Sequence, residues 1–144
     1  MGPAMLVIDA SVAVKFVTEE PGSEEAYEIV AGPEPLIAPD WVLAECANAI
    51  ARKVQDDQLS RAAAEASFTE LPRFFSKLFD TGRLLDAGFQ LALDIDHAVY
   101  DCLYLALAIR EGAPVVTADE GLIKAARRRG LDGHVRLLGK ENGR

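Results

Sequence analysis

The chain has 144 residues, half of them hydrophobic, and its 15 Lys and Arg against 23 Asp and Glu give a formal net charge of −8 at pH 7. That length suits one domain with a sizeable core, and two cysteines that form no CxxC pair exclude a disulfide scaffold or a zinc ribbon. The longest apolar run, over 102–109, is too short to span a membrane, and no secretion signal is evident, so we expect a cytoplasmic protein without a membrane partner.

In the first half of the chain, short apolar runs alternate with helical patterns. Residues 1–4 are expected to be a cloning remnant or a disordered start, and residues 5–140 to form a single domain. The predicted elements are, in order, a buried strand at 5–8, a helix after Asp9, a helix capped by Ser23, a strand at 36–38, a helix at 41–55 and a helix capped by Ser60. Pro72 is expected to interrupt the last of these, and the aromatic segment 73–81 fits helix, strand or loop.

The second half continues the alternation. Its predicted elements are helices at about 82–94 and 97–110, the second opened by Asp94 or Asp96, a strand at 115–117, a basic helix that runs to Arg129 and ends at Gly130, and a strand at 135–138. Strands that alternate with helices, without a repeat or a linker, indicate one α/β domain. We expect a mostly parallel central sheet with helices on both faces.

Two aspartates follow predicted strands. Asp9 ends the first strand and Asp119 comes just after the strand at 115–117. Parallel strands would place both at the edge of the sheet where ligands bind in such folds. Each also precedes a helix, and a role as a helix N-cap explains either residue alone equally well.

Two further acids lie within apolar helical patterns. Glu45 and Asp101 are each flanked by hydrophobic residues, and no Lys or Arg follows either of them by one helical turn. Burying a carboxylate costs several kcal/mol unless it is paired or binds a metal. Looking back one turn, only His97 could pair with Asp101. A solvated helix edge or a distant arginine would also explain these two acids.

Four carboxylates brought together would repel one another and raise each other's pKa. A divalent cation resolves this conflict, and oxygen ligands favour Mg²⁺ or Mn²⁺. Zinc is disfavoured because His97 and His134 are isolated from each other, and we expect both to be ordinary surface or loop residues. A metal held by carboxylates can promote hydrolysis of a phosphodiester bond. The hydroxyls of Ser11 and Thr117 could hydrogen-bond to the metal-binding carboxylates and so orient them. Alternatively, they could form helix caps or turn hydrogen bonds.

Basic residues are concentrated at the end of the chain. Residues 124–144 contain seven Lys and Arg, whereas the net charge of the whole chain repels phosphates and argues against indiscriminate binding of nucleic acid. Arg127, Arg128 and Arg129 are therefore candidates for steering RNA. The alternative is that they form a solvated helix face.

Four short motifs, taken in chain order, resemble those of a known family. They are Ile8-Asp9-Ala10-Ser11-Val12, Ala38-Pro39-Asp40 ahead of Glu45, Tyr100-Asp101-Cys102 with the apolar residues up to Ala108, and Val116-Thr117-Ala118-Asp119. In this order and spacing the chain resembles the PIN domain and, more narrowly, the toxin of VapBC-type toxin–antitoxin pairs. The resemblance extends from Met5 to about Leu138.

The resemblance implies a PIN-like fold and a Mg²⁺- or Mn²⁺-dependent endoribonuclease whose acidic quartet is Asp9, Glu45, Asp101 and Asp119. Asp9 and Asp101 would be the firmest metal ligands. It also implies a cytoplasmic homodimer that hydrolyses structured RNA, and a small cognate antitoxin that blocks the site. Glu120 departs from the family pattern, in which a basic or small residue often follows the last aspartate.

Other classes of function fit less well. A phosphatase of the haloacid-dehalogenase kind needs a second acid two residues after the first, where this chain has Ser11. A phosphate-accepting receiver domain needs several acids near its first strand, and Asp9 stands alone there. A catalytically silent PIN-like module that only binds partners stays open, although the complete quartet argues against it.

Overall fold

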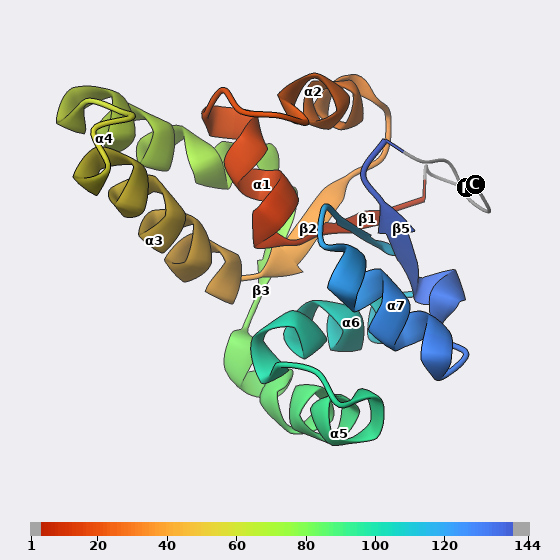
Figure 1. Cartoon of the computed structure of the whole chain (residues 1–144). Helices are drawn as coiled ribbons and strands as arrows, with labels where there is room; N and C mark the ends of the chain where they lie inside the picture. The colour runs from red at the N-terminus through yellow and green to blue at the C-terminus, as the bar shows by residue number, and fades with distance from the viewer. Residues whose placement is uncertain (1–3, 140–144) are drawn as a thin grey trace.

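Five short strands form one parallel sheet in the part of the chain that the computed structural model describes, residues 4–139. They are β1 (Leu6–Ile8), β2 (Leu36–Pro39), β3 (Lys77–Phe79), β4 (Val115–Thr117) and β5 (Val135–Leu137). Their order across the sheet is β3-β2-β1-β4-β5 (Figure 1). Because β1 and β4 are parallel neighbours, the residues that follow them meet at one edge of the sheet.

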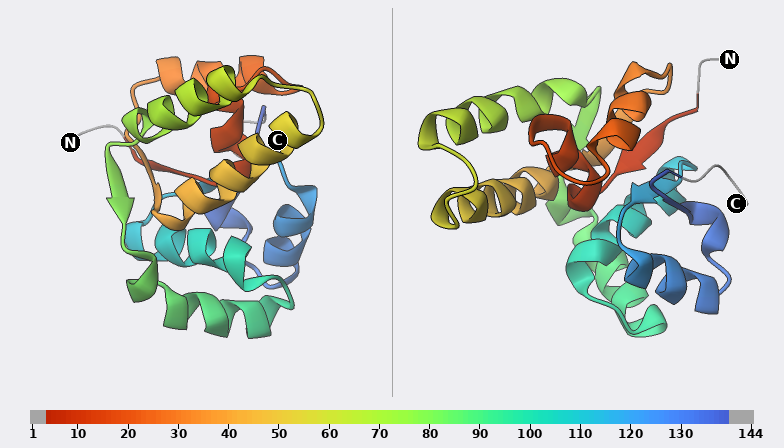
Figure 2. Two further views of the ribbon diagram at one scale, coloured as in Figure 1. Left: turned by 90° about the vertical axis from the view of Figure 1, so that its left-hand side faces the viewer. Right: turned by 45° about the horizontal axis from the view of Figure 1, so that its top comes forward.

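Helices cover both faces of the sheet. They are α1 (Ala10–Val17), α2 (Ser23–Ala31), α3 (Trp41–Gln55), α4 (Arg61–Glu70), α5 (Leu85–Ile95), α6 (Val99–Glu111) and α7 (Glu120–Arg128). Right-handed crossovers place α1 to α4 on one face and α5 to α7 on the other (Figures 1 and 2). Within residues 4–139, no helix combines the length and the apolar character needed to cross a membrane.

The core explains the apolar runs of the sequence. Every residue of β1, β2 and β4 is buried. In α6 the run Cys102–Ala108 is buried as well, because the sheet covers one side of this helix and α5 covers the other. Asp101 lies in the first turn of α6, directly ahead of this buried run. A charged residue at that point is therefore a departure from an otherwise apolar helix.

The structure confirms the predicted α/β class and parallel sheet. The helix at 41–55 and the strand at 115–117 have the predicted bounds. Ser60 caps α4, since its Oγ accepts a hydrogen bond from the N–H of Ala63 at 3.1 Å. The ambiguous segment 73–81 contains β3, a three-residue strand that pairs with β2 at the edge of the sheet.

Two predicted helix starts are wrong. The N-cap of α2 is Gly22, whose φ of +94° is left-handed, and Ser23 is the first helical residue. The Ser23 hydroxyl instead donates to the carbonyl of Thr18 at 3.0 Å. The N-cap of α6 is Ala98, whereas Asp96 ends α5 in a left-handed conformation with φ +54°. Residues 1–3 of the predicted start and residue 140 of the predicted domain lie outside the described residues.

Candidate metal centre

The first two predicted acids lie at the carboxyl ends of neighbouring strands. Asp9 directly follows β1, and its N–H donates to the carbonyl of Val116 in β4 at 3.4 Å. Asp119 follows β4 by two residues and caps α7, because its Oδ1 accepts from the N–H of Gly121 at 2.8 Å. Asp9 caps α1 in the same way, accepting from the N–H of Val12 at 3.2 Å. Each aspartate therefore caps a helix and also lies at the edge of the sheet where ligands bind, so both interpretations of the sequence hold.

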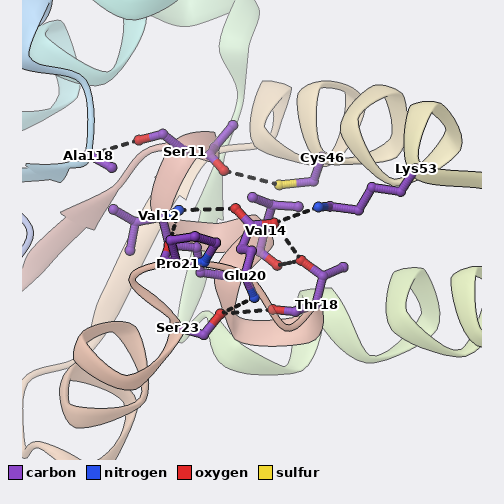
Figure 3. Close-up of polar contacts among 12 residues, drawn as sticks. Ser11, Val12, Val14, Thr18, Glu20, Pro21, Ser23, Cys46, Lys53 and Ala118 are labelled. Atoms are coloured by element: carbon purple, nitrogen blue, oxygen red, sulfur yellow. Dashed lines mark hydrogen bonds and ion pairs between the residues drawn. The ribbon is translucent and has the colours of Figure 1, made fainter. Parts of the chain in front are cut away.

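Ser11 joins the two loops that carry these aspartates. Its hydroxyl donates to Asp9 Oδ1 at 2.6 Å and accepts from the N–H of Ala118 at 2.9 Å, a contact visible in Figure 3. The buried hydroxyl of Thr117 lies 3.4 Å from that of Ser11 and accepts from the N–H of Asp119 at 3.0 Å. Ser11 therefore contacts the carboxylate of Asp9, whereas Thr117 contacts the backbone of Asp119.

Asp101 meets Asp119 and a histidine at this edge. One imidazole nitrogen of His97, Nε2, lies 2.7 Å from Asp101 Oδ2. One ligand atom from each of His97, Asp101 and Asp119 lies within 4.8 Å of the other two. His97 makes the pairing with Asp101 that its spacing allowed, and it lies in a loop, between α5 and α6, as expected. The sequence did not indicate that this loop residue also approaches Asp119. Three potential metal ligands converge here, two from around the start of α6 and one from the start of α7.

Glu45 reaches the same region from α3. Its Oε1 accepts a hydrogen bond from the hydroxyl of Tyr104, which is buried in α6, at 2.5 Å. Burial raises the pKa of Glu45, the Tyr104 hydroxyl opposes that rise, and the charge of Asp101 adds to it. Glu45 is therefore close enough to Asp101 for the two carboxylates to repel each other.

Burial and a neighbouring negative charge also disfavour the ionised form of Asp9, and more strongly than that of Glu45. Burial raises its pKa from 3.8 to about 7, against the lowering effect of hydrogen-bonding groups on Ser11, Thr117 and Val12, and the charge of Asp101 raises it further. Asp101 thus acts on both Asp9 and Glu45. No Lys or Arg among residues 4–139 forms an ion pair with any of these four acids.

Each of the four carboxylates is held through one oxygen only. The held oxygens are Asp9 Oδ1, Glu45 Oε1, Asp101 Oδ2 and Asp119 Oδ1. The second oxygen of each accepts no hydrogen bond from residues 4–139 within the usual distance limits. This arrangement fixes the direction of each side chain and leaves an oxygen for another partner. Carboxylate oxygens with one nearby imidazole fit a hard divalent cation.

The sequence of the chain also matches a known protein family. A sequence model of the family described as PIN domain matches residues 6–128. The chain belongs to the PIN-domain family.

Curated relatives place this PIN domain among the VapC proteins. It is 32% identical over 119 residues to Ribonuclease VapC3 of Pyrobaculum aerophilum, an alignment that covers 81% of this chain and 91% of the relative. It is 31% identical over 102 residues to Ribonuclease VapC1 of Mycobacterium tuberculosis, which covers 70% of this chain and 73% of that one. The resemblance seen in the sequence motifs is confirmed.

Two solved structures share the fold of this PIN domain. The crystal structure of PAE2754 from Pyrobaculum aerophilum matches with a TM-score of 0.70 at 20% identity, over 92% of this chain and 83% of that chain. The crystal structure of FitAcB from Neisseria gonorrhoeae matches with a TM-score of 0.62 at 16% identity, over 94% and 97% of the two chains. These matches confirm the predicted α/β architecture.

Sequence reasoning missed part of the site of this PIN domain. Tyr104 escaped notice because its hydroxyl is polar only at the tip of an otherwise apolar side chain. The signal for His97 was present in its spacing of four residues from Asp101. Geometry alone shows that His97 also approaches Asp119.

The arginine run lies apart from the acids. Arg127 and Arg128 end α7 and Arg129 follows, whereas Asp119 precedes the first residue of the same helix. A helical rise of 1.5 Å per residue separates the two ends by roughly 12 Å. All three arginines are exposed, as is Glu120 at the start of α7. Any influence of the arginines on a ligand at the acids is thus exerted at long range.

Proposed function

We propose that this PIN domain is a Mg²⁺- or Mn²⁺-dependent endoribonuclease toxin that hydrolyses RNA phosphodiester bonds in the cytoplasm and is neutralised by a cognate antitoxin. The observation that carries the proposal is the approach of Asp101 and Asp119 to each other and to His97 within 4.8 Å. Asp9 and Glu45 lie outside that group of ligand atoms but near enough for the charge of Asp101 to raise the pKa of each. No Lys or Arg among residues 4–139 pairs with any of the four acids. Metal ions are the usual solution for such a cluster. The reaction is taken from the VapC relatives, whose names describe them as ribonucleases.

Each acid has a proposed role. Asp9, Asp101 and Asp119 would hold the cation, and Glu45 would either hold it as well or accept the proton of the attacking water. When bound, the cation supplies positive charge that offsets repulsion among the acids and stabilises charge developing on the phosphate. The site geometry supports these roles, because each acid offers an oxygen that no described residue holds.

The neighbouring side chains would fix the acids in place. His97 holds one oxygen of Asp101, and the Tyr104 hydroxyl holds one oxygen of Glu45. Ser11 does the same for Asp9 and also ties its loop to that of Ala118. We assign Ser11 and Tyr104 to positioning, since each donates a hydrogen bond to an acid. His97 contacts Asp101, and its ring nitrogen also lies among the grouped ligand atoms, so it is a candidate ligand as well.

The partners belong to the proposal as well. Arg127, Arg128 and Arg129 would draw the RNA backbone toward a domain whose overall charge repels it. The proposal also includes a homodimer and a small antitoxin that covers the acids, since the resemblance to VapBC-type toxins implies both. Neutralising the three arginines should weaken RNA binding and reduce its salt dependence.

The direct test is RNA cleavage by the purified protein. End-labelled RNA is incubated with Mg²⁺ or Mn²⁺, and with EDTA, using the wild type, Asp101→Asn and the control Asp94→Asn, which neutralises an exposed acid of α5. We expect cleavage only with metal and a loss of more than about 100-fold in Asp101→Asn, because even groups that support metal ligands contribute 10- to 100-fold.

Two results would contradict the proposal. Cleavage by Asp101→Asn at the wild-type rate would remove Asp101 from the site. Metal-independent binding of partners without any cleavage of RNA would favour the catalytically silent binding module.

A further inference from the structure

Two aromatic side chains form a stack beside the acids. Trp41 begins α3 and Tyr100 lies in the first turn of α6. Their rings are nearly parallel, with centroids 5.3 Å apart and an interplanar angle of 12°. Tyr100 is 58% exposed although Trp41 covers one of its faces, so the stack ends in an aromatic surface open to solvent.

The stack adjoins the candidate metal centre through both of its members. Tyr100 is the residue before Asp101, and Trp41 lies one helical turn before Glu45. The indole Nε1 of Trp41 is buried and makes no hydrogen bond to residues 4–139. The pair therefore lies on the two helix starts that carry Asp101 and Glu45.

Trp41 is held firmly in this position. Its backbone N–H donates to Thr81 Oγ1 at 2.9 Å, and the same hydroxyl donates to Asp40 Oδ1 at 2.6 Å. The N–H of Thr81 also donates to Asp40 Oδ1, at 3.2 Å. The start of α3 is thus tied to the segment that follows β3. A stack ordered in advance loses little freedom when a further ring is added.

From this geometry we propose that Tyr100, backed by Trp41, is a stacking platform for an unpaired nucleobase next to the phosphate that is cleaved. This inference rests on the proposed function. Sequence-specific proteins commonly stack splayed-out RNA bases on aromatic rings, and such stacking contributes substantially to binding of single strands. The arginines of α7 act at long range in a chain of net charge −8, so a non-ionic contact beside the acids would add to the binding of the substrate.

The proposal specifies a substrate class. A base can reach the open face of Tyr100 only when it is unstacked from its neighbours, so the cleaved position lies in a single strand, loop or bulge. A continuous duplex would keep that base within its own stack. Short single-stranded RNA should therefore bind more tightly than a duplex of the same length.

Binding can be followed through Trp41, which is the only tryptophan of the chain. Trp41 fluorescence is titrated with a short single-stranded RNA in the Asp101→Asn background, which prevents cleavage, and compared among Tyr100→Ala, Tyr100→Phe and Tyr27→Ala. Tyr27 is the matched control, a 40% exposed tyrosine on α2. We expect about tenfold weaker binding for Tyr100→Ala, within the range reported for single stacking residues, and unchanged binding for the other two.

Cleavage kinetics in the active background give the second measurement. Tyr100→Ala should raise KM about tenfold with little change in kcat, and Tyr100→Phe should restore KM. Equal affinity of wild type and Tyr100→Ala, or equal affinity for single strand and duplex, would overturn the inference. So would a Tyr100→Ala variant that loses a dimer while its RNA affinity is unchanged, since the stack would then be a contact between two copies.

The stacking platform and the ribonuclease activity can be tested separately. If the wild type cleaves RNA and Tyr100→Ala has the same KM, only the stacking platform is wrong. If the wild type binds Mn²⁺ and cleaves no RNA, the proposed function itself is wrong.

Discussion

The two ends of α1 carry buried or half-buried carboxylates with opposite surroundings. Near its carboxyl end, Glu20 accepts hydrogen bonds from Lys53 at 2.9 Å, Lys15 at 3.0 Å and Thr18 at 2.9 Å (Figure 3). Burial disfavours the charge of Glu20, but these donors outweigh it and lower the pKa of Glu20. At the amino end, Asp9 has no cationic partner among the described residues, and its pKa is raised to about 7.

The difference separates a carboxylate that supports the fold from one suited to bind a ligand. The Glu20 network ties α1 to α3 and closes the loop to α2, where Ser23 and Pro21 also take part (Figure 3). Asp9 is more deeply buried than the half-buried Glu20 and has hydroxyl and amide donors only, so its charge is stabilised incompletely. A group that lowers stability in the free protein and lies among like charges is typical of a functional site.

The largest expected effect is on stability at the Asp9 end. Because the folded-state pKa of about 7 exceeds the ordinary value of 3.8, the folded protein binds more protons between these values, and its stability falls as pH rises through that window. Asp9→Asn removes this loss. We expect it to raise the unfolding free energy of the metal-free protein by at most about 4 kcal/mol above pH 7, and by nothing near pH 3.5. Urea unfolding in EDTA at several pH values measures this.

Removing the charge of Glu20 should lower the unfolding free energy, whereas removing the charge of Asp9 should raise it. Glu20→Gln removes the charge that faces Lys15 and Lys53 and leaves one acceptor oxygen in place of two. Hydrogen bonds to charged groups contribute roughly 2 kcal/mol. Since the pKa of Glu20 is lowered on folding, its contribution is full above pH 4.5 and is lost as pH falls through the folded-state pKa. Urea unfolding at pH 7 should show the loss. A stabilising Glu20→Gln would contradict the comparison.

A smaller effect is expected from Ser11→Ala. The variant loses the hydroxyl that joins Asp9 to the loop of Ala118, so we expect a loss of about 1 kcal/mol in stability and about tenfold weaker Mn²⁺ binding. The matched control is Ser67→Ala, which removes a hydroxyl bonded to the Val17 carbonyl at 2.9 Å, away from the acids. Calorimetric titration with Mn²⁺ distinguishes them, because the control should lose stability alone.

Much of the fold could be predicted from the sequence because its strands are buried on both faces. Continuous apolar runs at β1, β2 and β4, each followed by a helix, specify a parallel α/β sheet. The strand β3 could not be found in this way. It has only three residues, its first residue is exposed, and its pairing with β2 joins segments about 40 residues apart.

The four acids of the site could be predicted because each stands out from its local sequence. Asp9 and Asp119 follow strands, and Asp101 and Glu45 interrupt apolar helices, so each leaves a signal in the local sequence. The approach of His97 to Asp119 depends on how α5, α6 and α7 pack, and local sequence does not record it. The stacking of Trp41 on Tyr100 likewise joins residues 59 positions apart.

The most direct test of the metal centre is the effect of Mn²⁺ on thermal unfolding at pH 7.5. A ligand at about 100 times its Kd stabilises the folded state by about 2.7 kcal/mol, which corresponds to a rise in Tm of roughly 5–10 °C for a chain of this size. We predict such a rise for the wild type and for Glu20→Gln, and its loss in Asp101→Asn. Equal Tm values of the wild type with and without Mn²⁺ would contradict the existence of the site.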